Sequence, residues 1–176
     1  MSASPEVLKP TASARDQPLS DRLLLSAVAL SSFSALLLEL ALTRLFSVVL
    51  FYHFAFLAIS IALLGLGAGG VFAHLWKERL QNVDLRRIAW NSNALSAIVI
   101  PVVVEIVLRV PVSLRLSGGN FVRLSVVYLC SAVPFFLTGL QFSVIFARQP
   151  SRITRIYGAD LIGGAAACLA VVPLLN

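Results

Sequence analysis

Charged residues are scarce in this chain of 176 residues, where they make up only 12% of the total. Soluble domains carry about twice that share, whereas here 59% of the residues are hydrophobic and the mean hydropathy is +0.91. The apolar residues lie in long runs that one compact soluble core cannot bury. The same numbers exclude intrinsic disorder, which requires low hydrophobicity. The composition therefore predicts a membrane protein.

Cysteine and histidine are also scarce, with two of each. Cys130 and Cys168 both fall inside apolar runs, so we interpret them as small buried hydrophobic side chains and not as a disulfide or metal pair. His53 has no second histidine or cysteine at metal-ligand spacing, because His74 lies a whole span away. We therefore expect no metal site and no cofactor in this chain.

Basic residues outnumber acidic ones, which gives a net charge of +6. Nucleic-acid binding requires a basic face with aromatic or groove-reading context, whereas these side chains lie in a leader and in short connectors, so nucleic acid is not an expected partner. Ten would share one side of a membrane: Lys9, Arg15, Arg22, Lys77, Arg79, Arg86, Arg87, Arg148, Arg152 and Arg155. Four would lie opposite: Arg44, Arg109, Arg115 and Arg123. This asymmetry predicts a multi-pass membrane protein with a cytoplasmic N-terminus.

A helix needs about 20 apolar residues to cross a hydrocarbon core about 30 Å thick. Five segments reach that length: roughly 23–42, 49–75, 88–108, 124–147 and 156–175. They must be helical, because lipid offers no partners for free backbone amides. We therefore predict an all-α polytopic transmembrane bundle over 23–176, preceded by a flexible cytoplasmic leader over 1–22. The chain stops directly after an apolar run, so we expect further transmembrane helices in a longer protein.

Ionisable residues inside the predicted spans are the candidates for an intramembrane polar site, since such residues usually face the bundle interior. The candidates are Glu39, Arg44, His53, Glu105 and Asp160. Glu39 and Arg44 are five residues apart and so point about 140° apart around a helix, which makes them poor direct partners. Glu39 is either a hydrogen-bonding anchor, with Arg44 reaching to the interface, or a substrate-related group.

The other three candidates each have a structural interpretation beside the functional one. His53 lies near an aromatic group and would either hydrogen-bond between helices or relay protons. Glu105 stands four residues before Arg109, which favours an intrahelical ion pair over a site beside the kink at Pro101. Asp160, one turn inside the last predicted span, would complement the helix dipole or lie near a ligand.

Glycines mark two places where helices are expected to approach closely. Gly65 and Gly69 have the four-residue spacing of a helix-packing motif, and the apolar helix around them argues against a phosphate-binding loop. Gly158, Gly163 and Gly164 flank Asp160, and small residues at 159, 163 and 167 share one face.

Two blocks of the chain, LLLELALTRLFSVVLFYHFAFLAISIALLGLGAGG and YGADLIGGAAACLAVVPLLN, resemble the membrane portion of bacterial spermidine synthase-like proteins. The shared pattern is an acid followed five positions later by Arg-Leu, then a glycine-rich span, and later a Tyr-Gly-Ala-Asp stretch. The matching positions are Glu39, Arg44, Leu45, Gly65, Gly67, Gly69, Tyr157, Gly158, Asp160 and Gly164. The resemblance covers about residues 23–176.

The resemblance implies a membrane domain that precedes a soluble, Rossmann-like transferase domain acting with an S-adenosylmethionine-type donor. The full-length protein would then be a polyamine aminopropyltransferase or a methyltransferase. This chain has no strand–glycine-loop–helix unit, so no catalytic residue can be assigned in it. The leading hypothesis is a domain that anchors or serves that transferase. The alternatives are a major-facilitator-like transporter for a cationic or small metabolite, in which Glu39, Glu105, Asp160 and Arg44 line a polar path, and a structural scaffold.

Overall fold

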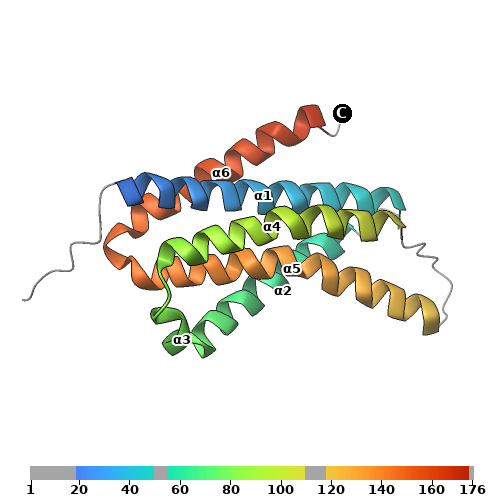
Figure 1. Ribbon diagram of the computed structural model, residues 1–176. Helices are drawn as coiled ribbons and strands as arrows, with labels where there is room; N and C mark the ends of the chain where they lie inside the picture. Colours follow the sequence, from blue (N-terminus) through green and yellow to red (C-terminus); the bar gives the residue numbers. More distant parts are fainter. Residues whose placement is uncertain (1–18, 50–54, 110–117, 175–176) are drawn as a thin grey trace, which may run out of the picture.

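The computed structural model describes residues 19–49, 55–109 and 118–174. These ranges are almost entirely helical and contain no strand, so the prediction of an all-α bundle is confirmed. The helices, shown in Figure 1, are α1 (Leu19–Val49), α2 (Ala55–Leu75), α3 (Lys77–Gln81), α4 (Leu85–Arg109), α5 (Gly118–Arg148), the 3₁₀ turn η2 (Pro150–Arg152) and α6 (Ile153–Leu174).

Five of these helices are long and apolar enough to cross a membrane: those over Arg22–Val48, Phe56–Leu75, Leu85–Arg109, Gly118–Arg148 and Pro150–Leu174. The largest difference from the predicted spans lies at the end of α1, which continues past Leu42 to Val49. The sequence LTRLFSVV contains no glycine or proline that would stop a helix. Arg44 is therefore part of α1 and not of a connector.

Helix α1 is central to the bundle, because it packs against α2, α4, α5 and α6. The two most extensive contacts join α2 to α5 and α1 to α6. The first part of α6 follows α1, and its C-terminal part leaves the other helices (Figure 1).

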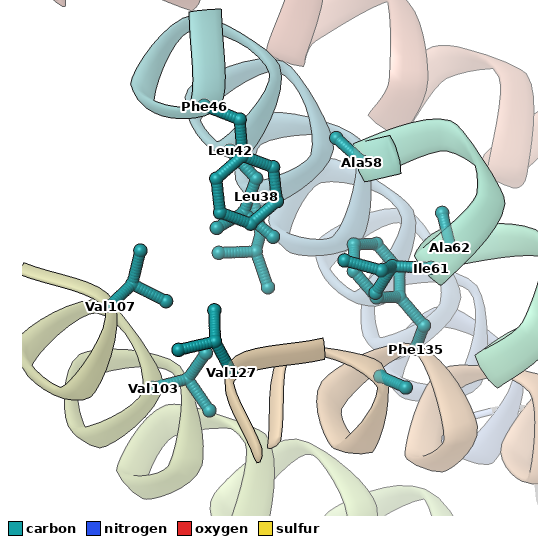
Figure 2. Packing of buried hydrophobic residues seen from close by; sticks show 11 residues of the cluster. Leu38, Leu42, Phe46, Ala58, Ile61, Ala62, Val103, Val107, Val127 and Phe135 are labelled. Atoms are coloured by element: carbon teal, nitrogen blue, oxygen red, sulfur yellow. The ribbon is translucent and has the colours of Figure 1, made fainter. Parts of the chain in front are cut away.

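The largest apolar cluster lies toward the C-terminal end of α1 and the start of α2 (Figure 2). Its buried members are Leu38, Leu42 and Phe46 of α1, Ala58, Ile61 and Ala62 of α2, Val103 and Val107 of α4, and Val127, Ala132 and Phe135 of α5. Four helices thus meet in one core. We refer to this end of the molecule as the apolar half.

Close backbone approach explains the extensive contact between α2 and α5. A Cβ placed on Gly65 would lie 2.5 Å from Phe135 Cβ and 2.6 Å from the Ala132 carbonyl oxygen, both far inside van der Waals contact. A Cβ on Gly69 would overlap the backbone of Phe136 in the same way. Only glycine lets the two helices come this near.

Candidate intramembrane polar site

Polar side chains from three helices meet in the half of the bundle nearer the start of α1. Ser31 of α1 lies at hydrogen-bond distance from Asn93 of α4 and from Gln141 of α5, where Ser31 Oγ and Gln141 Oε1 are 3.0 Å apart. Ser31 is 5% exposed and Gln141 only 1%. These side chains, of which Asn93 is half-buried, form a hydrogen-bonded group between the helices, which we call the polar layer.

The hydrogen-bond inventory of the polar layer decides how the Gln141 amide is oriented. The Ser31 hydroxyl has one proton and so cannot donate to both amide oxygens. Asn93 Nδ2 donates to the Ala27 carbonyl oxygen at 3.3 Å, which leaves Asn93 Oδ1 to accept from Ser31. Gln141 Nε2 is buried without a partner. Turning this amide by 180° places Nε2–H against Ser31 Oγ, and we assign that orientation because it satisfies the donor.

Asp160 of α6 is joined to the same part of α1. Its Oδ1 accepts a hydrogen bond from Ser32 Oγ, and the carboxyl group is half-buried. Since Ser31 and Ser32 are adjacent, their side chains point about 100° apart, and α1 contacts α5 and α4 through one hydroxyl and α6 through the other. The expected role of Asp160 at the helix dipole is not supported. Helix α6 begins at Ile153, so Asp160 lies two turns inside, beyond the reach of that effect.

The depth of the polar layer, and of Asp160 beside it, follows from the distance to the helix ends. Asn93 is eight residues from the start of α4, while Gln141 and Asp160 are each seven residues from an end of their helices. At about 1.5 Å per residue, all three lie about 10–12 Å from the ends of the helices. These ends carry the basic residues Arg86, Arg148 and Arg152. The polar layer is therefore inside the hydrophobic span, in its half next to the basic end.

The structure does not bring the predicted ionisable candidates together. Glu39 is half-buried on α1, about two turns beyond Ser32, and Arg44 is exposed. The ion pairs in the described ranges join Arg87 to Asp84 and Arg109 to Glu105, so Glu39 and Arg44 are not paired. Arg109 donates to Glu105 one turn earlier on the exposed surface of α4, which is the intrahelical pair favoured by the spacing. His53 lies outside the described residues.

The glycines near Asp160 differ from one another. A Cβ on Gly163 would overlap the backbone of Ala29, so α6 touches α1 closely there. A Cβ on Gly164 would lie 3.5 Å from Leu36 Cδ2, an ordinary contact, and one on Gly158 would meet nothing within 4 Å. The expectation of two buried cysteines needs correction: Cys130 is half-buried, but Cys168 is exposed on the outer face of α6, because only one side of that helix packs on α1.

None of the three members of the polar layer, Ser31, Asn93 and Gln141, is among the site residues predicted from the sequence. They are uncharged and so were not considered beside the ionisable candidates. The sequence does indicate Asn93 and Gln141, because an asparagine or glutamine within an apolar span usually hydrogen-bonds to a neighbouring helix. Chemically, this arrangement offers amide, hydroxyl and carboxyl groups that can hold helices together or bind a polar ligand.

Comparison with known proteins provides no further identification: no family model, curated protein or solved structure matches the chain. In the parts of the chain that the structure describes, no three His, Cys, Asp or Glu side chains are grouped as they would be in a metal site.

Proposed function

We propose that this chain is the integral membrane domain of a spermidine synthase-like protein and that it anchors a cytoplasmic transferase domain of the S-adenosylmethionine type. The main support is that the side chains of the polar layer bond to other groups within the bundle. Ser31, Asn93 and Gln141 are hydrogen-bonded to one another or to backbone; Ser31 and Gln141 are buried between helices, and Asn93 is half-buried. Groups used in this way hold a bundle in one arrangement, which suits an anchor.

The basic end of the bundle offers a fixed surface for such a domain. Arg148, at the end of α5, donates to the carbonyl oxygens of Leu80 and Val83, with Nη1 lying 2.7 Å from Val83 O. The short helix α3 and the turn after it are thereby tied to a membrane-spanning helix. By the distribution of basic residues, this surface faces the cytoplasm, where a transferase would find its soluble substrates.

The test is purification of the protein from native membranes in mild detergent, followed by mass spectrometry and an assay of aminopropyl or methyl transfer. We expect a transferase domain with a strand–glycine-loop–helix unit, either on the same polypeptide or stably bound to it. The proposal fails if neither the reading frame beyond Asn176 nor the purified material contains such a domain.

Transport is the second candidate function, and Asp160 is the observation that favours it. A half-buried carboxyl group inside the span is a suitable partner for a cationic substrate such as a polyamine. Under this proposal, Asp160→Asn and Glu39→Gln would each reduce uptake of the cation into proteoliposomes. Unchanged uptake in both variants would count against transport. A reduced unfolding temperature with no uptake in any variant would indicate a structural scaffold.

A further inference from the structure

A cleft of about 340 Å³ lies at the basic end of the bundle, between the end of α2, helix α3 and the end of α5. Its volume is at the lower end of the range typical of small-molecule sites. His74, Lys77 and Arg148 contribute basic side chains to its lining, and no acidic side chain of the described residues lines it. The cleft is therefore suited to an anionic group.

The remainder of the lining is largely apolar. Ala73 of α2, Leu80 of α3, and Val144 and Ala147 of α5 form most of this surface. A free inorganic anion gains nothing from such walls. An amphiphile with a negative head and a hydrocarbon tail would contact both kinds of surface.

Arg148 keeps its positive charge available in this cleft. Its two hydrogen bonds go to the backbone carbonyl oxygens of Leu80 and Val83, which are neutral. A guanidinium group has five N–H donors, so three remain after these bonds. Both ion pairs of the described ranges lie elsewhere, between Arg87 and Asp84 and between Arg109 and Glu105.

Aromatic residues place the cleft at the level of the lipid headgroups. Trp76, which precedes α3, stacks on Phe72 with ring centroids 5.3 Å apart. The Arg79 guanidinium lies over the Trp76 ring, 4.6 Å from its centroid. Tryptophan beside arginine at the end of an apolar span is typical of the membrane–water interface.

We propose that this cleft binds an anionic glycerophospholipid, with the phosphate-bearing headgroup at His74, Lys77 and Arg148 and the first part of an acyl chain against Ala147 and Val144. Basic pockets between spans on the cytoplasmic side are suited to such headgroups. The inference depends on membrane insertion and not on the transferase assignment, so either proposal can fail without the other.

Native mass spectrometry of the purified chain, titrated with phosphatidylglycerol or phosphatidylcholine, tests this site. We expect phosphatidylglycerol to bind at least fivefold more tightly. Lys77→Gln should weaken its binding about fivefold, since a basic residue near the surface contributes about that factor. Arg86→Gln is the matched control: it removes an equal charge from an exposed position at the same end but outside the cleft, and it should change binding less than twofold.

A second variant tests the apolar part of the cleft without changing charge. Ala147 is exposed, so Ala147→Phe should leave the fold intact while filling the acyl-chain surface and weakening phosphatidylglycerol binding about fourfold, the contribution of one buried CH₂ group. Equal effects of Lys77→Gln and Arg86→Gln would overturn the proposal in favour of general electrostatic attraction. Inorganic phosphate that displaces the lipid at comparable concentration would overturn it in favour of a free-anion site.

Discussion

The two halves of this bundle are held together by different interactions. In the apolar half, Phe46, Ile61 and Phe135 are almost completely buried, and glycines bring α2 and α5 into backbone contact. In the other half, the buried apolar clusters are smaller, and Ser31, Asn93 and Gln141 form hydrogen bonds between helices. Lipid tails are as apolar as side chains, so association in membranes depends on packing and hydrogen bonding and not on the hydrophobic effect. The apolar half depends on packing alone, whereas the other half adds hydrogen bonds between helices to the close approach of α6 and α1 at Gly163.

The largest expected loss of stability is for a glycine variant in the apolar half. Gly65→Leu places side-chain atoms where the Ala132 carbonyl and Phe135 Cβ already lie. Backbone atoms cannot move aside cheaply, so the free energy of unfolding should fall by about 3 kcal/mol, measured by denaturation of the detergent-solubilised protein with increasing SDS. Gly67→Leu is the control, because a Cβ on Gly67 meets nothing within 4 Å. It should leave stability unchanged or slightly raised. Equal losses in both variants would contradict the close approach of α2 and α5.

The second-largest expected loss of stability is for a variant of the polar layer. Gln141→Leu keeps most of the side-chain volume but removes the amide that bonds to Ser31. Hydrogen bonds between membrane helices contribute about 0.6–2 kcal/mol, so we expect a loss of about 1 kcal/mol in the same SDS denaturation. Gln149, which lies just after α5, supplies the matched control in Gln149→Leu, for which we expect no loss. A more stable Gln141→Leu variant would show that the polar layer does not stabilise the bundle.

Two buried serines sharpen the comparison, because only one of them should lose stability when its hydroxyl is removed. Ser31→Ala removes a hydroxyl that bonds across helices, so stability should fall by about 1 kcal/mol. Ser131 belongs to α5 in the apolar half, where its hydroxyl is fully buried and has no partner among the described residues. Ser131→Ala removes this unsatisfied group and should be neutral or stabilising by up to about 1 kcal/mol. The thermal unfolding temperature in detergent measures both, and a loss in Ser131→Ala comparable to that in Ser31→Ala would contradict the assignment.

The smallest effect concerns the exposed ion pair of α4. Glu105→Gln breaks the contact with Arg109 at a surface position, where such pairs contribute about 0.3–0.5 kcal/mol. The unfolding temperature should therefore change by no more than about two degrees. A loss as large as that of Gln141→Leu would mean that Glu105 has a partner in another helix.

Much of the fold could be predicted from the sequence, because a membrane span is identified by the length and hydropathy of one continuous stretch of residues. Five apolar runs of sufficient length correspond to five long helices, and the ends of α4 and α6 differ from the predicted ends by three residues or fewer. The end of α1 was harder to predict, since Arg44 looked like a connector residue. Charge does not stop a helix, and LTRLFSVV contains nothing that does.

The polar site was less predictable, because it depends on which helices are neighbours. Asp160 was recognised by its charge alone, but its partner Ser32 lies 128 residues away. Nothing local to either residue shows that α6 packs on α1. Glu39 and Arg44 were predicted as site residues for the same reason as Asp160, namely their charge within an apolar span. They do not contact each other in the structure, because they point to different sides of α1.

The central claim is that five helices cross a membrane with the basic end in the cytoplasm, and cysteine accessibility tests it most directly. In a chain carrying Cys130→Ala and Cys168→Ala, single cysteines are introduced by Arg86→Cys at the basic end and by Arg123→Cys near the opposite end, both exposed positions. A membrane-impermeant maleimide added to intact spheroplasts should label the Arg123→Cys protein at once and the Arg86→Cys protein only after permeabilisation. Labelling of Arg86→Cys from outside, or recovery of the chain in the soluble fraction, would contradict this account.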